Sequence, residues 1–408
     1  MRNVKNQRNP YSKTIHACYF GYISQAIVCC FASLLFTRFQ AQYGVPLYKV
    51  TTLITVCFVL QLLVDLSAAF FVDKIGYRAA AAGGNAFAAA GLCALTFLPE
   101  LFHDPFVGLL ISVLIYSVGA GLLEVVVSPI VEACPSDNKE GTMSLLHSFF
   151  CWGCAAVVLL STAFFRLFGI ENWKIASLLW ALVPLFNTVN FCRVPLADAS
   201  SGEAESLSLG GLLKKRLFWL IVLLMLCAGA CEQSVSQWSS AFVEKALAIP
   251  KAYGDLVGTA SFAILMGTAR ALYGKYSRRL PLAPSLFVCS LICVAAYCLI
   301  AFSGSPVLSI VGIALCGFSV GIMWPGTFSL AAASINGGSA LFAFLALAGD
   351  LGCSAGPTFV GMAAGTHGDD LKFGIAAALV FPVVMAVLSA VRMVSERKKQ
   401  EHKESADV

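Results

Sequence analysis

Charged side chains are scarce in this sequence. Lys, Arg, Asp and Glu together make up 12% of its 408 residues, whereas they make up about 25% of a typical soluble domain. Apolar residues account for 59%, and the mean hydropathy is +0.82. A water-soluble fold could not hide so much apolar surface. The formal net charge of +5 comes mostly from short loops and tails, so it concerns orientation in a membrane and implies no nucleic-acid partner.

Histidine is also rare, and the few histidines form no H-E-x-x-H motif or similar cluster. The five histidines stand at positions 16, 103, 147, 367 and 402. No nucleophile and base recur together near a membrane interface either, so we expect no enzyme, no metal and no cofactor. The sixteen cysteines lie almost wholly inside apolar runs, where cysteine behaves as a small hydrophobe. Cys151 and Cys154 have C-x-x-C spacing but lack a βαβ setting, which favours packing over redox chemistry.

What the sequence does contain is a series of apolar segments of about 20 residues, the length of a helix that crosses a bilayer. We predict about twelve such helices, at 14–38, 50–71, 79–99, 105–131, 141–166, 171–193, 215–243, 254–274, 281–302, 306–333, 339–364 and 371–394. The first follows the basic start Met1–Lys13 and is too long for the apolar region of a signal peptide. The fold class is therefore an all-α multi-pass membrane protein.

The helices divide into two sets of six. A polar stretch with the sequence Ala-Asp-Ala-Ser-Ser-Gly-Glu-Ala-Glu-Ser separates them, as a flexible linker would. Most Lys and Arg residues fall in both tails and in alternate loops, which predicts that both termini are cytoplasmic. The predicted domains are a six-helix bundle at 1–193, a cytoplasmic linker at 194–214, a second six-helix bundle at 215–395 and a polar cytoplasmic tail at 396–408.

The two halves also resemble each other. Val45–Pro46 before the second helix recurs as Ile249–Pro250 before the eighth, and Ser128–Pro129 in the fourth helix recurs as Trp324–Pro325 in the tenth. The two offsets are similar, which is typical of a parallel repeat about an axis along the membrane normal. Such a repeat places a solute site between the halves near the middle of the membrane.

The loop Asp73-Lys-Ile-Gly-Tyr-Arg78 between the second and third helices resembles the signature loop of the major facilitator superfamily. That resemblance implies a fold of about 12 transmembrane helices and an inner gate in this loop. Ala69 stands where the family has a glycine, and an ordinary positively charged inner loop is the alternative. The expected gate residues are Asp65, Asp73, Lys74, Gly76 and Arg78, with Arg270 as their counterpart in the second half.

The stretch from Gly119 to Glu124, followed by Ser128–Pro129 and His147, is similar to the fucose permease group of that superfamily. In that group a helix 4 glutamate serves substrate binding and proton coupling, which the resemblance transfers to Glu124. The group's partner acid in helix 1 is missing here, and this helix offers His16, Gln25 and Ser33 as polar candidates.

Four acids lie away from the ends of the predicted helices: Asp65, Glu124, Glu232 and Asp350. An ionisable group there costs about 2.5 to 3.5 kcal/mol by insertion scales, so each needs a partner or a water-filled cavity. Helix 7 carries the densest polar patch. We expect Glu232, Gln233, Gln237 and Trp238 to line the solute site, whereas hydrogen bonding between helices is the alternative.

The second half holds two further candidates. Asp350, among glycines, could exchange a proton or bind a cationic group, although a buried protonated acid would fit as well. Trp324 precedes Pro325, which should break the helix and free a carbonyl that needs a partner. We expect Trp324 to line the site, and His147 to be an interfacial histidine.

These features favour alternating access in which a small polar, sugar-like solute is carried in symport with protons, with Glu124 and Asp350 as the coupling acids. The first alternative is a proton-driven efflux antiporter for amphipathic or cationic compounds. The second alternative is a sensor or scaffold protein with the same fold. The expected partners are the solute, the proton and the lipid bilayer. We expect a monomer in the plasma membrane, most typically the bacterial inner membrane.

Overall fold

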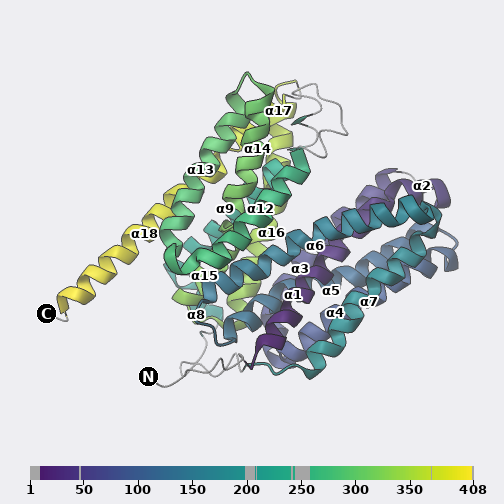
Figure 1. The fold of residues 1–408 in the computed structure, drawn as a ribbon, viewed down its shortest axis with the longest axis horizontal. Coiled ribbons are helices and arrows are strands. Elements are labelled where there is room, and N and C mark those ends of the chain that lie inside the picture. The colour runs from purple at the N-terminus through teal and green to yellow at the C-terminus, as the bar shows by residue number, and fades with distance from the viewer. Residues whose placement is uncertain are drawn as a thin grey trace. The chain divides into compact units, whose positions relative to one another are not determined.

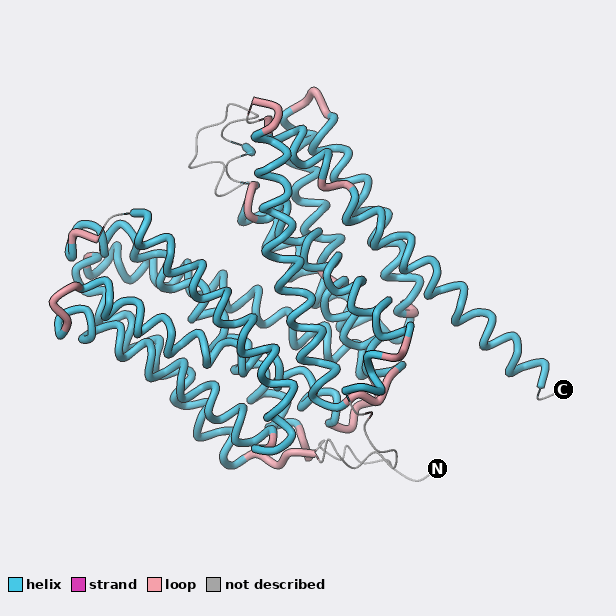
Figure 2. The backbone as a smooth tube through the Cα atoms, turned by 180° about the vertical axis from the view of Figure 1, so that it is seen from behind, coloured by secondary structure: helices cyan, strands magenta, loops and turns pink. Residues whose placement is uncertain are grey.

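The structure is a computed structural model that describes residues 10–45, 47–197, 207, 209–239, 242–243, 258–368 and 370–406. All regular structure in these residues is helical (Figure 1, Figure 2). Ten helical segments in this part of the chain are long and apolar enough to cross a membrane. Each of the twelve predicted helices coincides with a helix or helix pair, so the all-α membrane fold is confirmed.

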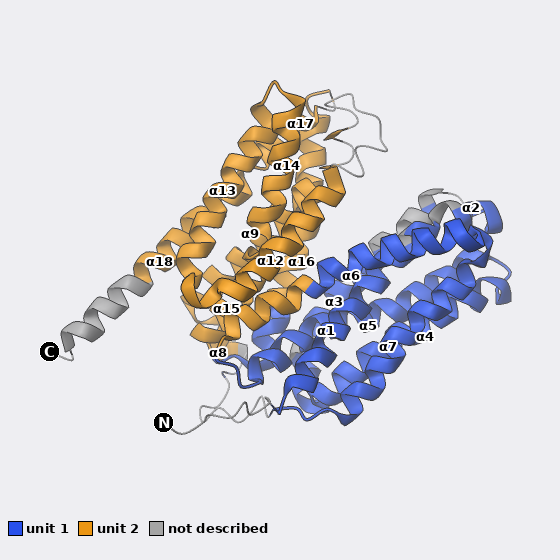
Figure 3. Ribbon diagram, viewed as in Figure 1, with its two compact units in different colours: residues 1–137, 149–207, 336–344 blue, residues 138–148, 208–335, 345–408 orange. Residues whose placement is uncertain are grey.

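The chain forms two compact units (Figure 3). Unit 1 comprises residues 1–137, 149–207 and 336–344, and unit 2 comprises residues 138–148, 208–335 and 345–408. Ten residues at the start of α6 therefore cluster with unit 2, although they precede the predicted linker. The predicted domain boundaries at 193 and 215 remain a prediction.

Unit 1 is built on helices of the first half of the chain. They are α1 (Ser12–Phe31), η1 (Ala32–Leu35), α2 (Phe36–Tyr43), α3 (Leu47–Ile75), α4 (Tyr77–Leu101), α5 (Pro105–Ala133), most of α6 (Lys139–Phe168), η2 (Ile170–Asn172) and α7 (Trp173–Arg193). Small residues bring α4 and α5 together: a Cβ on Gly119 would lie 2.5 Å from the Gly84 carbonyl oxygen. Such close backbone approach is how membrane helices gain van der Waals contact.

Unit 2 contains the helices of the second half. They are α8 (Leu209–Leu213), α9 (Arg216–Ser236), α12 (Ser261–Tyr276), η5 (Ser277–Arg279), α13 (Leu282–Phe302), α14 (Pro306–Val320), α15 (Met323–Ser334), most of α16 (Gly338–Gly365), α17 (Leu371–Ala377) and α18 (Val380–Ala406). A Cβ on Gly229 of α9 would lie 2.2 Å from the Gly349 carbonyl oxygen of α16, so these two helices also pack backbone to backbone.

Two predicted helices differ in detail from the structure. The seventh was predicted to reach residue 243, but α9 ends at Ser236, and Gln237 and Trp238 form a turn. The Ser239 hydroxyl donates to the Ser236 carbonyl at 2.8 Å, and this kind of local bond competes with the helical ladder. The break predicted in the tenth helix is confirmed, since α14 ends at Val320 and α15 begins at Met323.

Candidate functional site

A buried hydrogen bond between two polar side chains of unit 1, Gln25 and Glu124, joins α1 to α5. The Gln25 amide nitrogen Nε2 donates to Oε2 of Glu124 at 2.8 Å. Both side chains are buried, with 4% of Gln25 and 9% of Glu124 exposed. The amide oxygen of Gln25, Oε1, is also buried, but no donor among the described residues forms a hydrogen bond with it. The structure thus brings together the glutamate of α5 and the glutamine that α1 offers in place of an acid.

A second contact lies one helical turn from this pair. Tyr22 is three residues before Gln25 on α1, and Ser128 is four residues after Glu124 on α5. Residues at these spacings share a helix face, and the Tyr22 hydroxyl is hydrogen-bonded to the Ser128 hydroxyl at 3.1 Å. Tyr22 was not among the predicted site residues, although it lies three residues from Gln25 in the same helix, a spacing that indicates a shared face.

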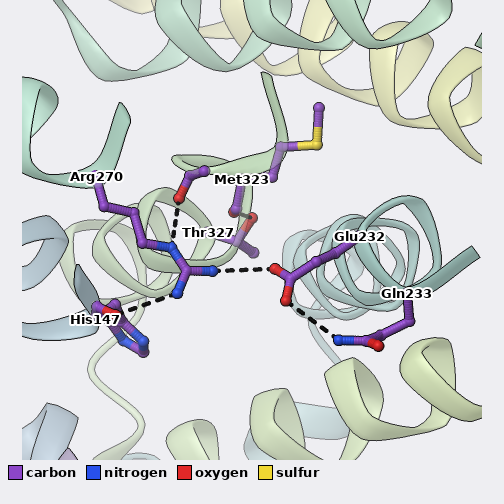
Figure 4. Close-up of polar contacts among 7 residues, drawn as sticks. His147, Glu232, Gln233, Arg270, Met323 and Thr327 are labelled. Atoms are coloured by element: carbon purple, nitrogen blue, oxygen red, sulfur yellow. Dashed lines mark hydrogen bonds and ion pairs between the residues drawn. The ribbon is translucent and has the colours of Figure 1, made fainter. Parts of the chain in front are cut away.

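The densest polar network of unit 2 surrounds Arg270 of α12, which is only 3% exposed (Figure 4). Its Nη2 donates to Oε2 of Glu232 in α9 at 3.0 Å. Its Nε donates to the Gly321 carbonyl at 2.9 Å, and its Nη1 donates to the His147 carbonyl at 3.2 Å. One guanidinium therefore joins α9, the α14–α15 break and the unit 2 part of α6.

The Gly321 contact explains why the helix break is tolerated. In an α-helix the carbonyl of residue 321 would accept from the N–H of residue 325, four positions later. Residue 325 is Pro325, which has no N–H. Arg270 supplies the missing donor, as the low-dielectric interior requires for a buried carbonyl.

Glu232 has contacts on both carboxylate oxygens. Oε2 accepts from Arg270, and Oε1 accepts from Nε2 of Gln233 at 3.4 Å (Figure 4). Arg270 was predicted to be a gate residue, and its ion pair with Glu232 was not predicted from the sequence. A base inside an apolar helix, together with Pro325 four positions after a glycine, was the signal available. His147, expected at the interface, is buried and its ring stacks against Phe328.

The other predicted solute-site residues of unit 2 lie in different surroundings. Gln237 is exposed. Trp238 donates from Nε1 to the Pro357 carbonyl at 2.9 Å. Trp324 is buried with its ring against Gly349, where an added Cβ would lie 2.3 Å from the ring. Asp350 is the next residue of α16 and is 9% exposed.

The predicted gate loop forms a one-residue turn between α3 and α4. Gly76 has a φ of +84°, a conformation that favours glycine. Asp73 and Lys74 are exposed. Nη1 of Arg78 donates to the Phe191 carbonyl at the end of α7, at 2.7 Å. Asp65 is fully buried within α3.

No metal centre accompanies these groups: the described residues contain no cluster of three or more His, Cys, Asp or Glu arranged to hold a metal ion. The family comparison decides the class of protein. The model of the Major Facilitator Superfamily matches residues 18–357. The chain belongs to the major facilitator superfamily. It is therefore a secondary transporter and not an enzyme, as the loop and the helix count predict.

Solved structures of other major facilitator proteins share this fold. The Escherichia coli fucose:proton symporter aligns with a TM-score of 0.78 at 14% identity, covering 94% of this chain and 99% of that one. A proton:xylose symporter gives 0.77 at 12% identity and covers 96% of both chains. The human organic anion transporter TETRAN gives 0.71 at 16% identity, covering 93% of this chain and 99% of its own. These identities show the fold alone. No curated protein sequence matches the chain.

Proposed function

We propose that this major facilitator protein works by alternating access and carries a small polar, sugar-like organic solute in symport with protons. The observation that supports the proposal is the hydrogen bond between Gln25 and Glu124. A buried carboxyl group can bind and release a proton, and an amide beside it can hydrogen-bond the hydroxyls of a solute. We assign proton coupling to Glu124, with Asp350 as the second coupling acid.

The names of two structurally similar proteins agree with proton-coupled transport of a sugar. One is a fucose:proton symporter and the other is a proton:xylose symporter. Gln233, Gln237, Trp238 and Trp324 are the further solute contacts that we propose, because amides bind hydroxyls and indole rings pack against apolar sugar faces. We place the protein as a monomer in a plasma membrane, with both termini in the cytoplasm.

The test is transport by the purified protein in proteoliposomes. A panel that includes L-fucose, D-xylose and other neutral sugars is screened by counterflow, and each sugar that exchanges is then tested for accumulation driven by an inward proton gradient. There are two controls. One is protein-free liposomes, and the other is the variant Glu132→Gln, which removes a charge from α5, the helix that carries Glu124. Counterflow without any gradient-driven accumulation would exclude proton symport.

Efflux of amphipathic or cationic compounds is the second candidate function. It is favoured by the ring of Trp324, which packs against the residue next to Asp350, since an aromatic ring near an acid suits an organic cation. The same proteoliposomes test it with a lipophilic cation such as tetraphenylphosphonium. Cation extrusion that depends on Asp350, with no sugar exchange, would replace the symport proposal.

A further inference from the structure

The amide of Gln25 is satisfied at one end only. Its Nε2 donates to Glu124, whereas its Oε1 is buried and no donor from the described residues reaches it. A buried acceptor without a donor is uncommon in proteins. The amide has donors at its nitrogen and an acceptor at its oxygen. Its orientation therefore depends on whether Glu124 presents an acceptor or a donor to it.

Glu124 is the buried acid of α5, and α3, which packs against α5, carries a second fully buried acid, Asp65. The other acids and bases in the described residues of α4, α5, α7 and the unit 1 part of α6 lie at exposed or half-buried positions: Arg78, Glu100, Glu132, Arg166, Lys174 and Arg193. On the face of α1 that carries Gln25, the titratable side chains one turn away are the phenol of Tyr22 and the thiol of Cys29. Such groups are ordinarily neutral near pH 7. A change of protonation at this place therefore involves Glu124 or Asp65, and the Glu124→Gln variant described below distinguishes the two acids.

We propose that Gln25 reports the protonation state of Glu124 to the solute by reversing its amide. When Glu124 is ionised, both of its oxygens are acceptors and Gln25 presents Nε2 to it, as observed. When Glu124 is protonated, its O–H needs an acceptor, and a half-turn about the Cγ–Cδ bond of Gln25 brings Oε1 to that place. The free end of the amide then changes from an acceptor to a donor.

This reversal defines the ligand chemistry at the free end of Gln25. A group that donates only or accepts only would fit one protonation state of Glu124 and not the other. A hydroxyl both donates and accepts, so a hydroxyl of the solute satisfies the amide in both states. The inference rests on the proposed sugar symport for the identity of the solute, but the amide reversal itself requires no solute.

Infrared difference spectroscopy tests the reversal on the full chain in lipid bilayers. The protein carries glutamine labelled with ¹³C at Cδ, and spectra are compared between pH values at which Glu124 is protonated and ionised. We expect a labelled amide band that shifts together with the Glu124 carboxyl band. Gln25→Met should remove the shifting amide band, Glu124→Gln should remove both bands, and Gln61→Met, at another buried glutamine, should remove neither.

A labelled band that does not shift, or one that still shifts in Gln25→Met, would overturn the proposal. If Gln25→Met does not fold, Gln25→Asn replaces it, since an unlabelled asparagine keeps the polarity and still removes the labelled band. Adding L-fucose or D-xylose, whichever shows counterflow, should shift the Gln25 band while Glu124 is ionised. No shift despite counterflow would refute the hydroxyl contact. If neither sugar shows counterflow, the sugar proposal fails, while the solute-free spectra still decide the reversal.

Discussion

Removing the guanidinium of Arg270 should be one of the most damaging single changes in unit 2. In Arg270→Met, Glu232 loses its ion-pair partner and the carbonyls of Gly321 and His147 lose a donor. Leaving a buried charge without its partner costs about 3–5 kcal/mol, and an unsatisfied buried carbonyl adds about 1–3 kcal/mol. We expect the free energy of unfolding to fall by at least about 4 kcal/mol.

A second substitution should separate these contributions. Glu232→Gln in the Arg270→Met background removes the stranded charge, so it should restore about 3 kcal/mol. In the wild-type background the same substitution should be destabilising. Pro325→Ala restores an N–H opposite the Gly321 carbonyl and should recover about 1 kcal/mol when Arg270 is absent.

The measurement is an unfolding titration in mixed detergent micelles, followed by circular dichroism. Arg279→Met, at an exposed arginine beyond the same helix, is the matched control and should change stability by less than about 0.5 kcal/mol. If Arg270→Met is as mild as this control, the three contacts do not stabilise the unit. If adding Glu232→Gln destabilises the Arg270→Met variant further, the pair is not held by charge.

Four further predictions concern transport and the loop. Glu124→Gln should abolish accumulation driven by a pH gradient and retain counterflow, and unchanged gradient-driven uptake would remove Glu124 from coupling. Gly76→Ala should lower the free energy of unfolding by about 1–2 kcal/mol in the same titration, because Gly76 has a positive φ. Gly83→Ala is the control and should leave stability unchanged, because Gly83 has open space around it. Asp73→Asn should slow transport without a tenfold loss of solute affinity. A single cysteine at Gln237, in a background without reactive native cysteines, should react with a water-soluble thiol reagent and be protected by solute, and no reaction under any condition would make this turn a packing element.

The positions of the helices could be predicted because their causes are local. A run of about 20 apolar residues needs a helix to satisfy its backbone in a membrane, and Gly76 or Pro325 marks where a helix ends. The end of α9 was not predicted, since the outcome there depends on whether Ser239 bonds to the helix backbone. The clustering of residues 138–148 with unit 2 is a matter of packing between distant segments, which apolar patterning does not encode.

Some of the candidate-site residues could be chosen from the sequence, but their partners could not all be predicted. Glu124 was found from the motif around it, and Gln25 was found because few polar residues occur in the first helix. The partner of Glu232 was not found, because Arg270 is 38 residues away and its position was interpreted from the loop that follows it. The insertion cost shows that a buried acid needs a partner, but it does not say which base supplies one.

Two of the buried acids, Glu124 and Glu232, differ in a way that bears on proton coupling. Glu232 is paired with a cation, so protonating it would leave Arg270 without its counter-charge and disturb the support of the Gly321 and His147 carbonyls. Glu124 is bonded to a neutral amide, which can donate to a carboxylate or accept from a carboxyl group. Glu124 can therefore keep a hydrogen bond to Gln25 in both protonation states. In the proposed proton symport this change occurs in every cycle, so we propose coupling by Glu124 and a structural role for the Glu232–Arg270 pair.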